Sequence, residues 1–140
     1  MRLVIDTDVF VAAIRSPSGA SAALLVHLLK RRATMLLSVP LAFEYEATGT
    51  RPEHLYAAKA SEADVANLID AIVDVIEPVE IHYQWRPQLS DAGDEMVLEA
   101  AVNGRATAIV TFNRRHYGIV PARFGIEVLS PADALRRIVT

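Results

Sequence analysis

The sequence predicts an α/β fold, with a central and mostly parallel sheet of about four to five strands and helices on both faces. Three short apolar runs, at 3–5, 34–38 and 107–111, have the length of strands that are buried on both sides. Segments with helical spacing separate these runs, which is typical of parallel strands joined by helical crossovers. The carboxyl ends of such strands share one edge of the sheet, so we expect the functional residues there.

The first strand brings an acid to that edge. Leu3-Val4-Ile5 ends abruptly in Asp6-Thr7-Asp8, and apolar residues resume with helical spacing at 9–14. Asp6 is therefore a candidate site residue at the carboxyl end of a strand. An Asp in this position also suits the N-cap of the following helix, and this tripeptide alone leaves both interpretations open.

A second strand and helix place another acid near the same edge. The apolar stripe over 20–32 predicts a helix, 34–38 a strand, and a further helix begins at Pro40. Glu44 lies one turn inside that helix, on the side of Tyr45, where the core is expected. A carboxylate on that side needs a partner.

The middle of the chain combines a break, a helix and an edge strand. Gly and Pro within 49–52 predict a break, and Ser61 with Asp64 predicts a capped helix that runs to about Val75. The acids of this helix lie opposite its apolar stripe and are expected in solvent. Residues 77–81 contain a proline and alternate in polarity, which favours a short edge strand.

The densest polar stretch, 89–94, precedes a third helix that carries acids. Asp94 is expected to begin this helix, whose apolar body covers 95–102. Asp91 lies one helical turn before Asp94. Glu99, further along, could point back toward the site, but a solvated helix face is the favoured interpretation.

The last part of the chain alternates strand and helix again. The polar segment 112–116 lies beyond the carboxyl end of the strand at 107–111. A short strand is expected at 126–129, followed by a helix that begins at Pro131 with Ser130 as its cap.

Length and hydropathy favour one domain, 1–140, with an interface. Hydrophobic residues make up 52% of the chain, which is high for a small protein, so a homodimer or a dedicated partner is expected to cover part of them. No apolar run reaches the roughly 18 residues that span a bilayer, and the N-terminus lacks the pattern of a secretion signal. We therefore expect a cytoplasmic protein without membrane contact.

The charge and the cysteine content limit the kinds of binding site that the chain can form. The net charge of −3 provides no global basic field, so a nucleic acid would have to be bound by local side chains. Twelve of the fourteen basic residues are Arg, whose guanidinium groups suit phosphate oxygens. The absence of cysteine excludes disulfides and thiolate-bound zinc, which leaves oxygen ligands for a metal.

Four acids converge on one edge of the predicted sheet: Asp6, Glu44, Asp91 and Asp94. Carboxylates that lie close together repel one another unless a cation holds them. Mg²⁺ or Mn²⁺ prefers such oxygen ligands. The chemistry of such a site is phosphodiester hydrolysis, because the metal activates a water and neutralises charge on the phosphate oxygens.

At these residues the sequence resembles the PIN-domain ribonucleases, and among them the VapC-like toxin components of toxin–antitoxin pairs. Four segments in the right order carry the resemblance over nearly the whole chain. They are Val4-Ile5-Asp6-Thr7-Asp8-Val9, Ser38 through Glu46, Asp94 through Ala101, and Ile109-Val110-Thr111-Phe112-Asn113-Arg114-Arg115-His116-Tyr117.

The resemblance implies that Asp6, Glu44 and Asp94 are catalytic, metal-binding acids. Asp91 is expected as a further acid of the metal site. Asp8 stands where the family commonly has Asn, and it could act through a water. The expected cofactor is Mg²⁺ or Mn²⁺.

The fourth segment supplies auxiliary and substrate-binding candidates. Thr111 ends the strand, and Asn113 replaces the Asp that is usual in the family, which favours one metal over two because an amide adds no negative charge. Arg114, Arg115 and His116 are candidates for contacts with the RNA backbone. His116 is a weaker candidate for a general base, since the sequence shows no carboxylate placed to orient it.

As a whole, the resemblance implies a metal-dependent endoribonuclease that cleaves single-stranded or looped RNA, with a cognate antitoxin as its partner. Two alternatives remain open. Asn113 could mark a binding module of the same fold that has lost catalysis. Asp6-Thr7-Asp8-Val9 also resembles the nucleophile motif of aspartate-dependent phosphatases, which need a lysine near the phosphate, and only Lys30 and Lys59 are present.

Overall fold

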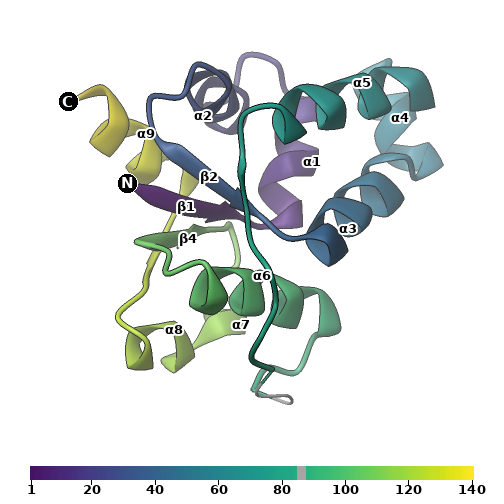
Figure 1. Ribbon diagram of the computed structural model, residues 1–140. Helices are drawn as coiled ribbons and strands as arrows, with labels where there is room; N and C mark the ends of the chain where they lie inside the picture. The colour runs from purple at the N-terminus through teal and green to yellow at the C-terminus, as the bar shows by residue number, and fades with distance from the viewer. Residues whose placement is uncertain (85–87) are drawn as a thin grey trace.

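A five-stranded parallel sheet lies at the centre of the structure, a computed structural model that describes residues 1–84 and 88–140 (Figure 1). The strand order is β3-β2-β1-β4-β5, and all four pairings are parallel, which confirms the predicted α/β class. The strands are β1 (Arg2–Ile5), β2 (Thr34–Leu37), β3 (Glu77–Pro78), β4 (Ala108–Val110) and β5 (Glu127–Leu129).

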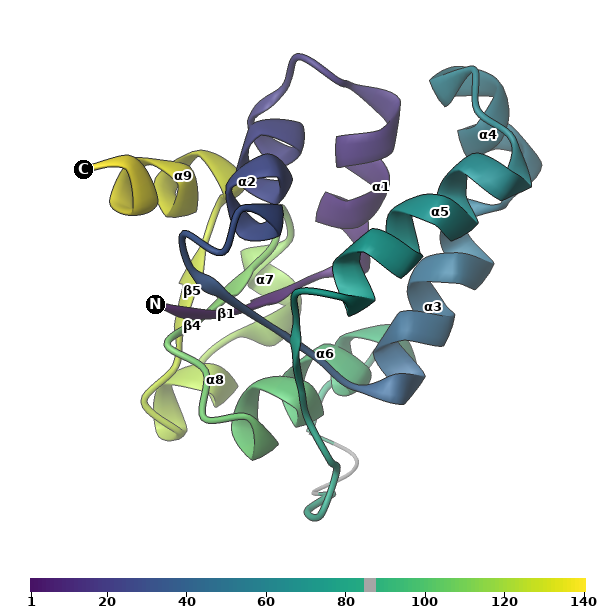
Figure 2. The same ribbon diagram turned by 45° about the horizontal axis from the view of Figure 1, so that its top comes forward.

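Helices cover both faces of this sheet (Figures 1 and 2). One face carries α1 and α2, with α9 packed against α2, and the other carries α6, which contacts β1, β2 and β4. At one side α3 packs against α1, α5 and α6. The helices are α1 (Thr7–Arg15), α2 (Ala20–Leu29), α3 (Val39–Gly49), α4 (Pro52–Ala58), α5 (Glu62–Val73), α6 (Ala92–Asn103), α7 (Arg114–Tyr117), α8 (Val120–Arg123) and α9 (Pro131–Val139).

The topology decides where the site lies. The central strand β1 has β2 and β3 on one side and β4 and β5 on the other, so the chain changes direction across the sheet at β1 and β4. Ligands of open parallel sheets bind at such a switch point, beyond the carboxyl ends of the strands. Ile5 pairs with Val110, and the next residues, Asp6 and Thr111, therefore emerge side by side.

Tyr45 anchors α3 to the end of β1. Its side chain is fully buried, and its ring stacks on Phe10 with ring centroids 4.6 Å apart. Its hydroxyl donates a hydrogen bond to the backbone carbonyl of Ile5, the residue before Asp6. This anchor fixes the helix that carries Glu44 relative to the strand that carries Asp6.

Four predicted elements differ from the observed ones. The helix expected over 20–32 ends at Leu29, because Arg31 has a positive φ. The break at 49–52 is followed by helix α4, because Pro52 occupies the first turn of a helix, where its missing N–H costs nothing. Helix α6 begins at Ala92 and not at Asp94, since Asp91 is its N-cap. The strand expected over 77–81 contains only Glu77 and Pro78, at the edge of the sheet as predicted.

The predicted caps at Ser61 and Ser130 are confirmed. Ser61 and Asp64 form a reciprocal capping box, and the Ser130 hydroxyl accepts a hydrogen bond from the backbone N–H of Asp133. The helices α7 and α8 have four residues each and were not predicted, because so short a helix has no periodic pattern.

Within residues 1–84 and 88–140 no single helix is long and apolar enough to cross a bilayer; only α1 and α2 together, bent by 103° relative to each other, reach the required length and composition.

Gly104 lies where α6 approaches the sheet, and we expect Gly104→Ala to lower the free energy of unfolding by about 1–3 kcal/mol. An added Cβ would lie 2.8 Å from the Ala100 carbonyl oxygen and 2.8 Å from Val79 Cγ2, closer than packed atoms tolerate. Denaturant unfolding measures the loss. Gly19→Ala is the control and should cost less, because its nearest neighbour is the movable Ser16 hydroxyl; equal stability of Gly104→Ala and wild type would contradict this packing argument.

Candidate active site

An acidic cleft of about 330 Å³ opens at the carboxyl edge of the sheet. It is bounded by the end of β1, by α3 and the start of α4, and by the start of α6. Five carboxylate side chains line it: Asp6, Asp8, Glu44, Asp91 and Asp94. The other lining residues are Thr7, Val11, Thr48, Arg51, His54 and Gly93.

Asp6 is held by two hydroxyl groups. Its Oδ2 accepts hydrogen bonds from Thr111 Oγ1 at 2.8 Å and from the Tyr117 hydroxyl at 2.9 Å, and all three side chains are buried. Asp6 occupies the N-cap position of α1, yet its side chain makes no capping hydrogen bond. The interpretation of Asp6 as an N-cap only is therefore wrong, and its carboxylate is turned toward the β4 side of the cleft.

Asp8 lies beside Asp6 and shares the Thr111 hydroxyl with it. Its Oδ2 accepts hydrogen bonds from Thr111 Oγ1 at 3.2 Å, from the Phe112 N–H at 3.1 Å and from Asn113 Nδ2 at 3.1 Å. Its Oδ1 is buried and has no hydrogen-bond partner in the described part of the chain. Burial and the charge of Asp6 raise the pKa of Asp8 to about 6.

Asp94 sits in the first turn of α6 and contacts α7. Its side chain is buried, and its Oδ2 lies 3.2 Å from His116 Nδ1. Burial, Asp6 and Asp91 raise the pKa of Asp94, and the facing His116 opposes that shift. The expectation that no carboxylate orients His116 is thus wrong, because Asp94 does so. The sequence pattern does not predict this contact, since the two residues lie far apart in the chain.

Glu44 and Asp91 complete the cleft from α3 and from the start of α6. Glu44 Oε1 accepts a hydrogen bond from Thr48 Oγ1 at 3.1 Å. Asp91 Oδ1 accepts from the backbone N–H groups of Gly93, at 2.7 Å, and Asp94, at 3.3 Å. Asp91 therefore caps α6 and positions Asp94 as well as lining the cleft.

Gly93 keeps the space between these two acids open. A methyl group at this position would lie 3.0 Å from Asp91 Oδ1 and 3.9 Å from Glu44 Oε1. The acids of α3 and α6 thus face each other across a position without a side chain.

The segment after β4 separates the four polar residues that sequence reasoning grouped together. Asn113 donates a hydrogen bond from its amide nitrogen to the carboxylate of Asp8, so its carbonyl oxygen does not face that group. His116 contacts Asp94. Arg114 reaches Asp133 of α9, with 3.3 Å between Nη2 and Oδ2. Arg115 is exposed, and its side chain makes no hydrogen bond or ion pair with the described residues.

A family model described as "PIN domain" matches residues 2–115, which is most of the chain. The chain belongs to the PIN-domain family. No curated protein and no solved structure matches it. PIN domains are generally nucleases that depend on divalent metals such as Mg²⁺.

The residues of this PIN domain fit a hard divalent cation by their chemistry. Carboxylate oxygens are the ligands that Mg²⁺ and Mn²⁺ take, and the acidic cleft offers five such groups, with the unpartnered Asp8 Oδ1 and the open position at Gly93 among its features. The ligand types therefore fit a divalent cation, but their present positions do not form a complete site. Among the described residues no three Asp, Glu or His side chains have an arrangement that could hold a metal ion.

Sequence reasoning missed several residues that line the PIN-domain cleft or contact its acids. Tyr117 ends the fourth segment of the resemblance but had no predicted role, and it lies just beyond the matched residues. Arg51 and His54 line the cleft because the unpredicted helix α4 starts there. The only signal for them was their place after the acid-bearing helix, and that signal is weak.

The raised pKa of Asp8 makes the stability of the metal-free protein dependent on pH. The folded protein binds the Asp8 proton with a pKa of about 6, against the ordinary value of 3.8, so this group destabilises the fold as pH rises through about 6. We expect Asp8→Asn to raise the free energy of unfolding at pH 8 by about 1–2 kcal/mol, discounted for partial exposure.

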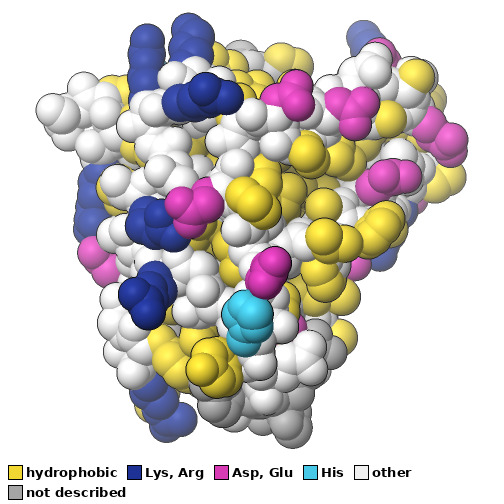
Figure 3. All heavy atoms as spheres, viewed as in Figure 1, with side chains coloured by type: hydrophobic (Ala, Val, Ile, Leu, Met, Phe, Trp, Pro, Cys, Tyr) yellow, Lys and Arg dark blue, Asp and Glu magenta, His cyan; other side chains and the backbone are white. Residues whose placement is uncertain are grey.

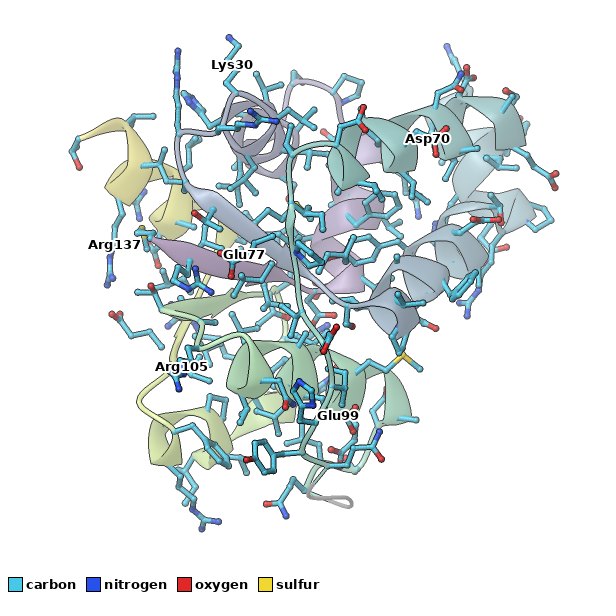
Figure 4. All side chains as sticks on the ribbon, viewed as in Figure 1. Lys30, Asp70, Glu77, Glu99, Arg105 and Arg137 are labelled. Carbon is cyan, nitrogen blue, oxygen red and sulfur yellow. The ribbon has the colours of Figure 1, made fainter. Side chains whose placement is uncertain are left out.

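Thermal unfolding in EDTA at pH 8 and pH 5 measures this effect. The advantage of Asp8→Asn should shrink at pH 5, where the wild-type carboxyl is protonated in the folded state. Asp70→Asn, on the exposed side of α5 (Figure 4), is the matched control and should show neither effect. An equal advantage of Asp8→Asn at both pH values would refute the assignment.

Proposed function

We propose that this PIN domain is a divalent-metal-dependent endoribonuclease that hydrolyses phosphodiester bonds of single-stranded RNA, with Asp6, Glu44 and Asp94 as its catalytic acids. The observation that carries the proposal is the convergence of five carboxylates on one cleft at the switch point of the sheet. Grouping like charges costs free energy, which a bound cation offsets.

The residues around the acids prepare them for this role. Thr111 and Tyr117 both donate a hydrogen bond to Asp6 Oδ2, which fixes the orientation of this carboxylate. A divalent cation, when bound, acidifies a water and offsets the charge that builds up on the phosphate oxygens. Asp6, Glu44, Asp94 and Asp91 would hold it.

We further propose that one cation suffices. Asn113 is neutral, and its amide nitrogen donates to Asp8, so this position adds no anionic ligand. Asn113 is also the basis of the alternative that the protein is a binding module without catalysis. The RNA cleavage experiment described below distinguishes such a module from a nuclease.

The phosphatase alternative finds no support in the cleft. None of the described residues that line it is a lysine. Lys30 follows the end of α2 and points away from the sheet in Figure 4, and Lys59 follows the end of α4.

We also propose that the protein is the toxin of a toxin–antitoxin pair and forms a homodimer. The resemblance of the four segments supports the toxin role. Hydrophobic side chains gather on the surface between α3 and α5 (Figure 3), and Val39 and Phe43 of α3 are both 68% exposed, which supports a covered interface. Growth arrest on expression, relieved by a protein encoded beside it, is the expected result; expression without any effect on growth would contradict the toxin role.

RNA cleavage tests the proposed activity. Purified protein incubated with a mixed-sequence single-stranded RNA should cleave it in Mg²⁺ or Mn²⁺ and should not cleave it in EDTA. Cleavage that persists in EDTA would contradict a metal-dependent nuclease. A protein that binds RNA and metal without cleaving would support the binding-module alternative.

A further inference from the structure

We infer that Arg51 and His54 on one flank of the acidic cleft, and Arg115 with Phe112 on the other, form the surface that docks a single-stranded RNA across the catalytic acids. We call these four residues the RNA rim. The inference deepens the proposed function and rests on it for the identity of the ligand.

The acids themselves create the need for such a surface. Five carboxylates line the cleft, and the whole chain carries a net charge of −3. A phosphate backbone that approaches this cleft is repelled unless cationic side chains on its flanks contact the neighbouring phosphates.

Arg51 provides a charge on the α4 flank. It lies at the N-cap of α4, lines the cleft and is exposed, and its guanidinium has no hydrogen bond or ion pair with the described residues. An unpaired guanidinium beside five acids is available for two hydrogen bonds to a phosphate.

His54 provides a donor on the same flank. Its Nδ1 lies 3.2 Å from Arg15 Nη1, and a guanidinium can only donate, so Nδ1 is the acceptor. A neutral His54 ring must then carry its proton on Nε2. Arg15 thereby orients His54 as a hydrogen-bond donor at the wall of the cleft.

The opposite flank is the segment after β4. Residues 112–116 line a hollow of about 450 Å³, which borders the cleft through the contacts of Asn113 with Asp8 and of His116 with Asp94. Arg114 is paired with Asp133, whereas the Arg115 side chain has no partner among the described residues. Arg115 is therefore the guanidinium of this segment that is available to a phosphate.

Phe112 indicates that the strand is unpaired. Its side chain is 55% exposed and lines the same hollow as Arg115. An exposed aromatic ring beside a cation suits a base that stacks on the ring while its phosphate contacts the cation. Bases within a duplex are not available for such stacking.

Equilibrium binding tests the RNA rim without any need for catalysis. A fluorescent single-stranded RNA is titrated with protein in EDTA over a range of salt concentrations. Arg51→Gln and Arg115→Gln should each raise Kd by about 5–10-fold at low salt and should flatten the slope of log K against log salt by about 0.7. Phe112→Ala should raise Kd by a similar factor, about 5-fold or more, with an unchanged slope, because stacking releases no counterions.

Arg105→Gln is the matched control. Arg105 is exposed and precedes β4, at the opposite edge of the sheet, away from the cleft (Figure 4). Arg105→Gln removes the same charge and should change neither Kd nor the slope of log K against log salt. The inference is overturned if Arg51→Gln and Arg115→Gln bind as wild type does, if Arg105→Gln weakens binding equally, or if duplex RNA binds as tightly as the single strand.

Cleavage assays in Mg²⁺ separate this inference from the proposed function. If cleavage depends on metal but the rim variants bind RNA as wild type does, the proposed nuclease activity is supported and the inference about the RNA rim is contradicted. Rim-dependent binding of single-stranded RNA without cleavage would support the rim and overturn the nuclease.

Discussion

Asp6→Asn and Asp94→Asn are each expected to lower metal-dependent RNA cleavage by more than about 100-fold, since even groups that only support a metal ligand can contribute that much. Each substitution removes a negative charge from the cleft without changing the shape of the side chain. Initial rates with excess RNA in Mg²⁺ measure the loss.

For Asp94→Asn, a loss of folding is not expected to explain the lower activity. Burial and neighbouring acids raise the pKa of Asp94, so the ionised group destabilises the metal-free fold, and Asp94→Asn should melt no lower than wild type at pH 8. Glu46→Gln, on the exposed side of α3 two residues from Glu44, is the control and should retain wild-type activity. If both Asn variants keep a tenth or more of the wild-type rate, the acids are not the catalytic centre.

Tyr117→Phe is expected to lower cleavage by about 10–100-fold and to weaken metal binding, as the loss of a group that orients a metal ligand does. The variant deletes one oxygen atom from a buried site and leaves Asp6 Oδ2 with Thr111 as its remaining hydroxyl donor. The free energy of unfolding should fall by about 1.5–3 kcal/mol, the range for a hydrogen bond to a charged group.

Tyr117 is a positioning residue, and its test needs more than one readout. We expect kcat to fall with little change in the KM for RNA, and calorimetric titration to show weaker Mg²⁺ binding. Tyr56→Phe on α4, where the side chain is 87% exposed, is the matched control. A Tyr117→Phe variant with wild-type Mg²⁺ affinity and kcat would show that the Asp6 contact is structural only.

The convergence of the acids could be predicted because it depends on topology. Asp6 and Thr111 follow neighbouring parallel strands, so strand assignment and the parallel rule place them at one edge. Asp94 lies at the start of the helix that leads into β4, and Glu44 one turn into the helix after β2. Each position follows from local pattern plus one rule of sheet geometry.

The contacts that hold those acids could not be predicted in the same way. Tyr117 lies in a four-residue helix that has no periodic signal, and its partner is 111 residues away. Burial of charge was also misjudged: Glu99 was expected in solvent, yet it is buried, and Glu95 is buried too. Glu95 Oε1 accepts the backbone N–H groups of Gln88, at 2.6 Å, and Leu89, at 2.7 Å. What packs over a helix depends on the returning chain, which helical periodicity does not describe.

The wide sequence separation of the Asp6 contacts bears on how the protein is made. Thr111 and Tyr117 lie 105 and 111 residues after Asp6, and the central strand β1 obtains its β4 neighbour only when residues 108–110 exist. During vectorial synthesis the first acid therefore leaves the ribosome long before the groups that orient it. A nascent or prematurely released chain that ends between residues 95 and 116 carries all five acids of the cleft but lacks Tyr117, so we expect it to have no nuclease activity until that segment has been made.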